Sequence, residues 1–156
     1  FDLPGFDYNN SPFSVKDIDF SNKTIVMCTT TGTKGIIKSV NAKEIITGSF
    51  VNCNAVVNHI KKTKNNTVTL VCTNDKYDDN EDFMCAAYIK SRLEGKPLNF
   101  QIVKNHLIRH PISYGFLRTP LTKYAREDFY ICMELDKFDF VIKAKRDKNS
   151  IYLEKM

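Results

Sequence analysis

Three short apolar runs alternate with helical patterns in the first half of the chain. Residues 24–29, 43–47 and 67–72 are rich in β-branched and apolar side chains, which is typical of buried strands. Between them, the spacing of apolar positions predicts one helix over 33–40, with Thr33 as its N-cap, and another from the residues after Asn52 to about Lys62. This alternation predicts parallel pairing of the strands through right-handed crossovers.

The second half of the chain is predicted to be mainly helical. A long polar loop, 73–80, leads to a helix from Glu81 to about Leu93, and Gly95 with the following proline is a strong stop signal. Further helices are expected at 100–109, at about 114–124 and at 128–136, although the last pattern also fits a strand. Two segments around a polar turn, 138–143 and 151–153, predict a hairpin, whereas residues 1–22 predict an extended segment broken by turns.

These elements predict one α/β domain over residues 1–156, a three-layer α/β/α fold with a mixed, largely parallel sheet and an antiparallel C-terminal edge. The 156 residues, of which 42% are hydrophobic and 26% charged, are enough for one core. No window approaches the roughly 18 consecutive apolar residues of a membrane helix, so we expect no membrane partner. Because Phe1 is not an initiator residue, the chain is expected to begin inside a longer one.

Charge and cysteine usage narrow the classes of partner. The formal net charge is +5, but the lysines are scattered, so we expect attraction of small acidic substrates rather than nucleic-acid binding. The five cysteines are odd in number and show no CxxC pairing, which predicts buried, reduced thiols in a cytoplasmic protein.

A run of threonines is the first candidate for chemistry. Thr29, Thr30, Thr31, Gly32 and Thr33 place four hydroxyl groups and a flexible glycine ahead of a predicted helix, and such groups can surround phosphoryl oxygens. Threonine is also simply a good strand residue, and the run alone does not decide between these two interpretations.

Acidic residues and histidines are the other candidates. Glu81 and Asp82 open a helix directly after a long loop, where a carboxylate can bind Mg²⁺ or merely complement the helix dipole. In the loop, Asp75, Asp78 and Asp79 either bind metal or solvate the loop. His106 and His110 have the i, i+4 spacing of a zinc pair, but no third ligand is legible beside them, so we expect surface or supporting roles.

Two matches to phosphatase motifs fail. Cys28 to Lys34 resembles the C-x5-R loop of cysteine phosphatases, but Lys34 stands where an arginine fork should clamp the phosphate. The pair Asp17 and Asp19 resembles the nucleophile motif of haloacid-dehalogenase-type phosphatases, but no apolar strand precedes it. Neither chemistry is therefore expected.

Several segments, taken in order, resemble the 2-phosphosulfolactate phosphatase family. They are Gly5-Phe6-Asp7 with Asn10-Ser11-Pro12, Cys28 to Thr33, Gly48-Ser49-Phe50-Val51-Asn52 with Ala55-Val56, Leu70-Val71-Cys72, Glu81-Asp82, Cys85-Ala86, and Asp128, Cys132 and Asp136. The departures are Asn9 for a glycine, Cys28 for a threonine, Thr31 for an asparagine, and Thr73-Asn74 for Ala-Gly. Nothing here resembles the N-terminal part of the family, so the chain looks like its C-terminal two-thirds.

The resemblance implies Mg²⁺-dependent hydrolysis of a phosphate monoester of a small acidic metabolite, 2-phosphosulfolactate in coenzyme M biosynthesis. It implies a pocket of Asn10, Ser11, Thr29 to Thr33, Ser49 and Asn52, with Glu81 and Asp82 as carboxylates for Mg²⁺ or the attacking water. A non-catalytic module that binds a phosphorylated or carboxylated metabolite is the alternative. A homodimer is left open.

Overall fold

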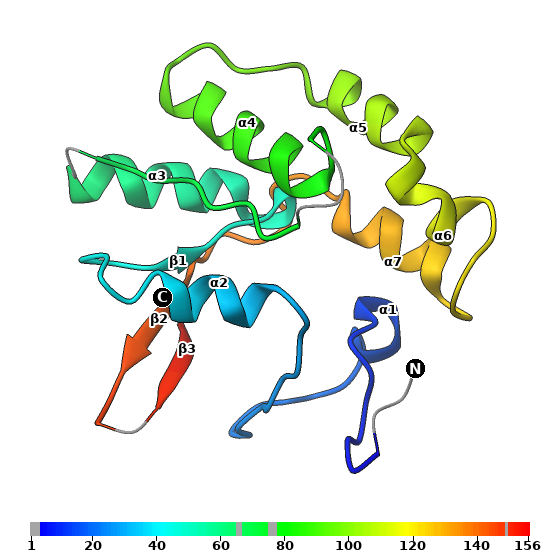
Figure 1. The fold of residues 1–156 in the computed structure, drawn as a ribbon, viewed down its shortest axis with the longest axis horizontal. Helices are drawn as coiled ribbons and strands as arrows, with labels where there is room; N and C mark the ends of the chain where they lie inside the picture. Colours follow the sequence, from blue (N-terminus) through cyan, green and yellow to red (C-terminus); the bar gives the residue numbers. More distant parts are fainter. Residues whose placement is uncertain (1–3, 65–66, 75–77, 149) are drawn as a thin grey trace.

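The computed structural model describes residues 4–64, 67–74, 78–148 and 150–156. Within these ranges its helices are α1 (Pro12–Val15), α2 (Gly32–Lys38), the 3-10 turn η1 (Phe50–Asn52), α3 (Cys53–Thr63), α4 (Glu81–Leu93), α5 (Phe100–Arg109), η2 (Pro111–Ser113), α6 (Tyr114–Leu117) and α7 (Ala125–Cys132). Its strands are β1 (Ile46–Thr47), β2 (Ile142–Arg146) and β3 (Ile151–Lys155). In the view of Figure 1, α3 and α4 lie above β1, and α2 lies below it.

The sheet within the described residues is small and antiparallel, in the order β1-β2-β3. Ile46 faces Lys143, and the β2–β3 ladder runs from Ile142 opposite Lys155 to Arg146 opposite Ile151. The expected C-terminal hairpin is therefore confirmed: β2 lies a few residues later than the predicted segment 138–143, whereas β3 begins at the predicted residue 151 and extends to Lys155. The chain mixes helix and strand, as the predicted α/β class requires.

The predicted parallel pairing does not occur within the described residues. Residues 24–29 and 67–72 carry no strand assignment, and the run 43–47 contributes only Ile46–Thr47. The reason is that a strand needs a neighbour for its backbone groups, and β1 finds that neighbour in β2 rather than in the other two apolar runs.

The core lies between α3, α4, α5 and the segments that follow η1 and α7. Phe50 and Tyr88 are buried in it, and the partly buried Phe100 packs on both, with ring centroids 5.2 to 6.2 Å apart in edge-to-face arrangements. The other buried members are Cys53, Val56, Val57, Ile89, Val103, Leu107, Met133 and Val141. This core fixes the direction of α4, whose first turn carries the candidate carboxylates.

Helix boundaries follow local signals, some of which the sequence prediction missed. α4 ends as predicted, because Gly95 adopts φ +73° and Lys96 N–H donates to Ser91 O at 2.8 Å, a Schellman motif. α1 was not predicted in the segment 1–22, although Ser11 caps it and Pro12 occupies a favoured first position. None of the described helices combines the length and hydropathy that crossing a membrane requires.

Three other boundaries differ from the predictions. α2 begins at Gly32 with Thr31 as its N-cap, so the predicted cap, Thr33, lies inside the helix. α6 covers only the start of the predicted helix 114–124, and α7 begins three residues before the predicted 128–136 and ends sooner. The thiols also differ, because Cys28, Cys72 and Cys132 are free but exposed rather than buried.

Candidate functional site

The threonine turn, residues 29–33, precedes α2 and is held by its own hydroxyl groups. Thr33 N–H donates to Thr29 Oγ1 at 3.2 Å, and the two threonine hydroxyl oxygens lie 3.3 Å apart. Thr30 and Thr31 are exposed to solvent. The turn therefore uses the side chains of Thr29 and Thr33 to keep its shape and presents Thr30 and Thr31 outward.

Glu81 and Asp82, in the first turn of α4, both point toward the turn at Thr73 and Asn74. Asp82 Oδ2 accepts from Thr73 N–H at 2.8 Å, from Thr73 Oγ1 at 3.0 Å and from Asn74 N–H at 2.9 Å. Glu81 Oε1 accepts from Asn74 Nδ2 at 3.0 Å. Glu81 Oε2 is buried and finds no hydrogen-bond partner in the described part of the chain.

Within the described residues, the buried Oε2 of Glu81 stands out at this turn because no donor satisfies it. A buried carboxylate oxygen without a donor is costly, because burial removes its water without replacing it. Carboxylate oxygens are the ligands that Mg²⁺ prefers in proteins, usually one or two of them beside substrate phosphates. Glu81 and Asp82 therefore fit a magnesium site in their chemistry.

Gly35 of α2 brings the threonine turn to these carboxylates. A Cβ placed on Gly35 would lie 2.6 Å from Thr73 Cγ2, which is far inside van der Waals contact. The same Thr73 donates to Asp82 through its hydroxyl group. The start of α2 is thus packed on Thr73, the residue that is hydrogen-bonded to Asp82. Gly35 and Thr73 are 38 residues apart along the chain.

Asn10 and Ser11, which are adjacent in the N-terminal segment, make hydrogen bonds with two different parts of the molecule. Asn10 Nδ2 donates to Cys28 O at 2.9 Å, directly before the threonine turn. Ser11 Oγ instead donates to the buried Asp128 of α7 at 2.7 Å, and Phe13 N–H donates to the same oxygen at 2.9 Å. Asn10 therefore belongs to the candidate site, whereas Ser11 anchors α1 on α7.

Ser49 and Asn52 form a capping box. Ser49 N–H and Ser49 Oγ both approach Asn52 Oδ1, at 3.0 and 3.1 Å, and Asn52 Nδ2 donates to Phe140 O at 3.2 Å. Asn52 is buried. The hydrogen bonds of these side chains thus serve the entrance to α3, and no described contact joins them to the threonine turn.

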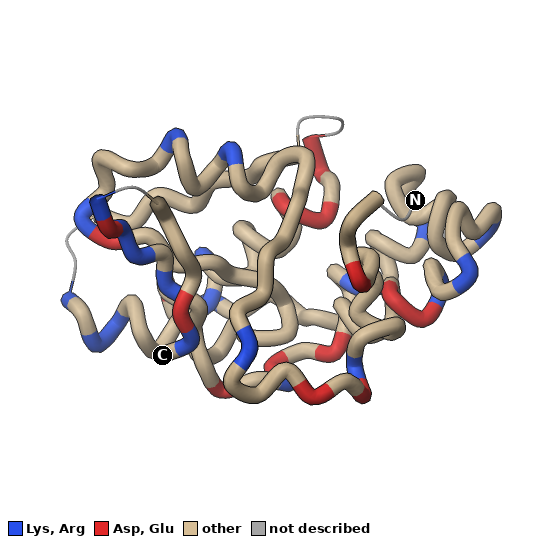
Figure 2. The backbone as a smooth tube through the Cα atoms, turned by 90° about the horizontal axis from the view of Figure 1, so that it is seen from below, with Lys and Arg blue, Asp and Glu red and all other residues tan. Residues whose placement is uncertain are grey.

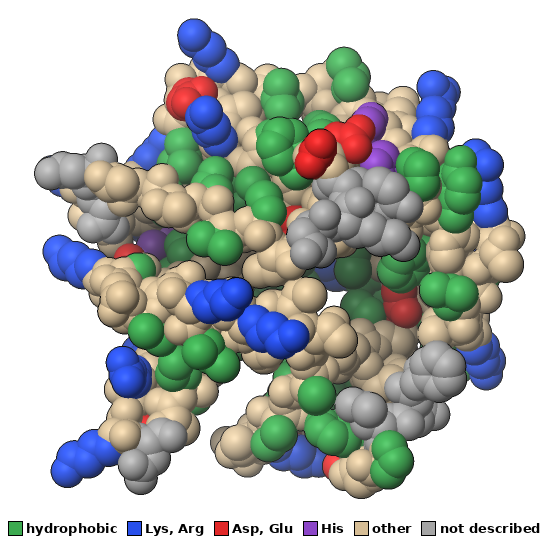
Figure 3. All heavy atoms as spheres, in the orientation of Figure 1, with side chains coloured by type: hydrophobic (Ala, Val, Ile, Leu, Met, Phe, Trp, Pro, Cys, Tyr) green, Lys and Arg blue, Asp and Glu red, His purple; other side chains and the backbone are tan. Residues whose placement is uncertain are grey.

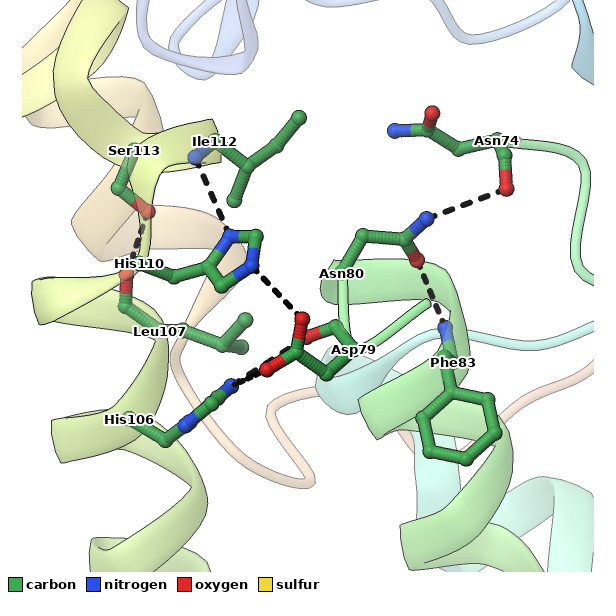
Figure 4. Close-up of polar contacts among 9 residues, drawn as sticks. All are labelled: Asn74, Asp79, Asn80, Phe83, His106, Leu107, His110, Ile112 and Ser113. Atoms are coloured by element: carbon green, nitrogen blue, oxygen red, sulfur yellow. Dashed lines mark hydrogen bonds and ion pairs between the residues drawn. The ribbon is translucent and has the colours of Figure 1, made fainter. Parts of the chain in front are cut away.

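Sequence reasoning missed a cluster of Asp79, His106 and His110, whose candidate ligand atoms all lie within 4.8 Å of one another. Figure 4 shows Asp79 pointing from the loop before α4 toward both imidazole rings of α5. Its carboxylate lies 3.1 Å from His106 Nε2 and 2.9 Å from His110 Nε2. The i, i+4 spacing of the histidines was legible in the sequence, but their acidic partner lies 27 residues before His106.

Hydrogen bonding argues against His110 as a metal ligand. Its Nδ1 accepts from Ile112 N–H at 3.1 Å, so this nitrogen carries the lone pair and Nε2 carries the proton. Nε2–H then donates to Asp79, and a metal would find no lone pair there. Burial acts to raise the pKa of the Asp79 carboxyl, but the hydrogen bond from His110 holds that pKa below its usual value.

We call Asp79, His106 and His110 the Asp79 clasp, since it ties the loop before α4 to α5. The next residue, Asn80, is buried; its Oδ1 accepts from Phe83 N–H at 3.0 Å, and its Nδ2 donates to Asn74 O at 3.1 Å. Asn80 is the N-cap of α4. The clasp thereby fixes the start of α4 and, with it, Glu81 and Asp82.

The described residues include a shallow pocket of about 520 Å³ on the outer side of α5. Its lining includes His106, Arg109 and His110. None of the threonines, Glu81 or Asp82 lines it, so this pocket is separate from the candidate site.

Cysteine chemistry is not favoured in the interior of the site. Burial raises the pKa of the Cys85 thiol to about 12 and that of the Cys53 thiol to about 11. Burial also raises the pKa of Cys72, with Asp82 adding to the shift. These thiols stay protonated at neutral pH and are poor nucleophiles.

Charged residues of both signs are distributed along the described chain. Figure 2 shows Lys and Arg spread over most elements and interrupted by Asp and Glu. Lysine and arginine exceed aspartate and glutamate by 23 to 18.

Comparison with known proteins assigns a relationship to most of the chain. The family model described as 2-phosphosulpholactate phosphatase matches residues 2–147. A protein named "Probable 2-phosphosulfolactate phosphatase" from Carboxydothermus hydrogenoformans is 38% identical over 163 residues, which cover 97% of this chain and 67% of that protein. A protein of the same name from Caldanaerobacter subterraneus is 30% identical over 156 residues, which cover 92% of this chain and 64% of that protein.

A Bacillus subtilis protein, again of that name, is 28% identical, with 93% of this chain and 64% of that protein covered. The chain thus spans about two thirds of the length of these relatives. No solved structure shows a significant match.

Proposed function

Because the chain belongs to the 2-phosphosulfolactate phosphatase family, we propose that it forms part of a phosphatase that hydrolyses the phosphate monoester of a small acidic metabolite. The names of its relatives make 2-phosphosulfolactate the first substrate to test, and a role in coenzyme M biosynthesis goes with it. One observation supports the proposal most directly: Thr73 is packed against Gly35 of α2 and hydrogen-bonded to Asp82 of α4.

Magnesium is the proposed cofactor, and Glu81 and Asp82 are the residues that would hold it. The support is the buried, partnerless Oε2 of Glu81 beside a carboxylate already held by three donors. When bound, Mg²⁺ supplies Lewis-acid stabilisation of charge on the phosphoryl oxygens.

The chain's own residues would orient the substrate. The exposed hydroxyl groups of Thr30 and Thr31 are free to donate to phosphoryl oxygens, while Thr29 and Thr33 keep the turn in shape. Asn10 supports the entrance of the turn through the carbonyl of Cys28. The net positive charge favours approach of an acidic substrate.

Within the described residues, Asp82 and the thiols near it are poor candidates for the attacking group. Asp82 is engaged by Thr73 and Asn74, and the nearby thiols of Cys72 and Cys85 have raised pKa values. We therefore propose that the nucleophile or its activating base lies in the third of the relatives that has no counterpart here. The 156 residues alone should bind anions better than they turn them over.

The same argument extends to the fold. We propose that the complete family member has the three-layer α/β/α arrangement with a largely parallel sheet, in which the apolar runs 24–29 and 67–72 are strands.

A non-catalytic module that binds a phosphorylated or carboxylated metabolite is the second candidate. One observation favours it. Three members of the implied pocket use their side chains in hydrogen bonds within the protein rather than leaving them available to a substrate: Ser11, Ser49 and Asn52.

The test is phosphate release from 2-phosphosulfolactate, with Mg²⁺ and with EDTA. The 156-residue chain is compared with the same chain joined to the missing third of the Carboxydothermus relative. Each is also made with Glu81→Gln and, as a matched control, with Glu127→Gln at the first turn of α7.

Turnover that requires Mg²⁺, occurs in the joined protein and is lost only with Glu81→Gln supports the phosphatase. Anion binding without turnover in either chain supports the binding module instead. Turnover that is unchanged in EDTA would contradict the magnesium proposal.

A further inference from the structure

Residues 24–28, the first open segment, expose apolar side chains on both faces of an extended chain. Ile25, Val26 and Met27 are 58%, 75% and 59% exposed, although consecutive residues of an extended chain point to opposite sides. In the described part of the chain, only one hydrogen bond reaches this backbone, from Asn10 to Cys28 O. The described residues therefore leave both faces of the segment largely exposed and give its backbone a single hydrogen bond.

Residues 67–72, the second open segment, are only partly covered by the described residues. Leu70 packs against the core, whereas Val68 and Val71 are 42% and 58% exposed. The described residues give no hydrogen bond to the backbone of 67–72. Figure 3 shows hydrophobic side chains at the surface over the region that this segment crosses in Figure 1.

Such segments have the composition of strands but no strand pairing within the described residues. Their unpaired N–H and C=O groups form a template for another extended chain, and their apolar side chains would gain from its cover. They also flank the candidate site, because one ends at the threonine turn and the other ends at Thr73.

We propose that the two open segments bind extended polypeptide from the third of a family-length chain that lies outside the matched region. The relatives supply this occupant, since 33 to 36% of their length has no counterpart in the match. Pairing would convert residues 24–28 and 67–72 into interior strands of a larger sheet. It would apply equally to a segment joined to these residues and to one made as a separate chain.

The test is co-expression of the 156-residue chain with the unmatched third of the Carboxydothermus relative, purified through a tag on the latter. Amide hydrogen exchange then compares the 156-residue chain alone and in the complex. Val26→Asp and Val71→Asp place a charge on each open segment. Ile102→Asp on α5 is the matched control, because Ile102 is 69% exposed but lies outside both segments.

We expect the complex to copurify, with exchange at residues 24–28 and 67–72 slowed at least tenfold. Val26→Asp and Val71→Asp should each lower the recovered complex at least tenfold, and Ile102→Asp should not. Circular dichroism of each variant alone checks that it still folds.

Three results would overturn the proposal. They are failure to copurify, copurification that the two aspartate variants do not weaken, and protection of both segments in the chain alone together with a dimeric mass, which would identify a second copy as the occupant. None of these readouts depends on phosphatase activity, so the proposal stands or falls separately from the proposed function.

Discussion

Gly35→Ala tests whether α2, which follows the threonine turn, packs against Thr73, the residue that is hydrogen-bonded to Asp82. The new methyl group would lie 2.6 Å from Thr73 Cγ2, whereas ordinary contacts begin near 3.4 Å. Thr73 cannot easily turn away, because its hydroxyl and N–H groups both donate to Asp82, at 3.0 and 2.8 Å. The variant must therefore displace α2, Thr73 or both.

The magnitude follows from two opposing terms. Overpacking of this kind costs about 1–3 kcal/mol of unfolding free energy. Alanine in place of glycine within a helix returns about 0.8–1 kcal/mol through its helix propensity. We expect a net loss of about 1 kcal/mol, which corresponds to roughly 2–4 °C in melting temperature for a chain of this size.

Thr73→Ser supplies the decisive background, since it removes Cγ2 and keeps the hydroxyl group that donates to Asp82. In that background Gly35→Ala should become neutral or stabilising, so the two substitutions should couple by about 1–2 kcal/mol. Thr69→Ser is the control, because Thr69 is exposed on the same segment. Urea unfolding of the four chains of each cycle gives the coupling energies.

A coupling with Thr73→Ser no larger than that with Thr69→Ser would refute the reasoning. It would mean that α2 does not rest on Thr73 and that the candidate site is not assembled as described.

Three further predictions concern other contacts. Asp128→Ala should lower the unfolding free energy by about 2–3 kcal/mol in urea titrations, because Ser11 Oγ and Phe13 N–H lose their buried acceptor, whereas Glu127→Ala should change it little. The hydrogen bond from Lys143, helped by His59, holds the pKa of Glu44 below its usual value against the effect of burial. Its stabilisation is thus present above the ordinary glutamate pKa and is lost as pH falls through the folded-state value. Glu44→Gln should therefore cost about 1–2 kcal/mol at pH 7 and progressively less as the pH falls through the folded-state pKa; a loss that does not change with pH would contradict the pairing. At pH 8, iodoacetamide should label the exposed Cys28 in the native chain long before Cys85, whose pKa is about 12. Peptide mass mapping measures the order of labelling, and labelling of Cys85 first would contradict its burial.

Local signals in the sequence were reliable where one residue decides the backbone. Gly95 ended α4 as expected, because its positive φ allows the Schellman hydrogen bonds. The C-terminal hairpin was also predictable, since its two strands are neighbours in the sequence and pair with each other. The boundaries of α2 and α7 were less so, because Thr31 and Thr33 are equally acceptable near a helix start.

Relationships between distant residues were much harder to predict. Nothing in the pattern shows that Asp79 meets two histidines of α5, or that Ser11 finds Asp128. The apolar run 67–72 has the composition of a strand, but its pairing depends on a neighbour that the described residues do not supply. Of the site residues named by resemblance, the structure joins Asn10, the threonine turn, Glu81 and Asp82, while Ser11, Ser49 and Asn52 serve the scaffold.

The unpartnered oxygen of Glu81 has a consequence for how this sequence can change. It is a point of local frustration, where the described residues leave a buried polar atom unsatisfied. Screens that reward thermal stability alone should discard Glu81 early and keep Asp82, whose Oδ2 accepts three hydrogen bonds. Selection for stability would thus favour replacement of Glu81, whereas selection for activity would favour keeping it beside Asp82.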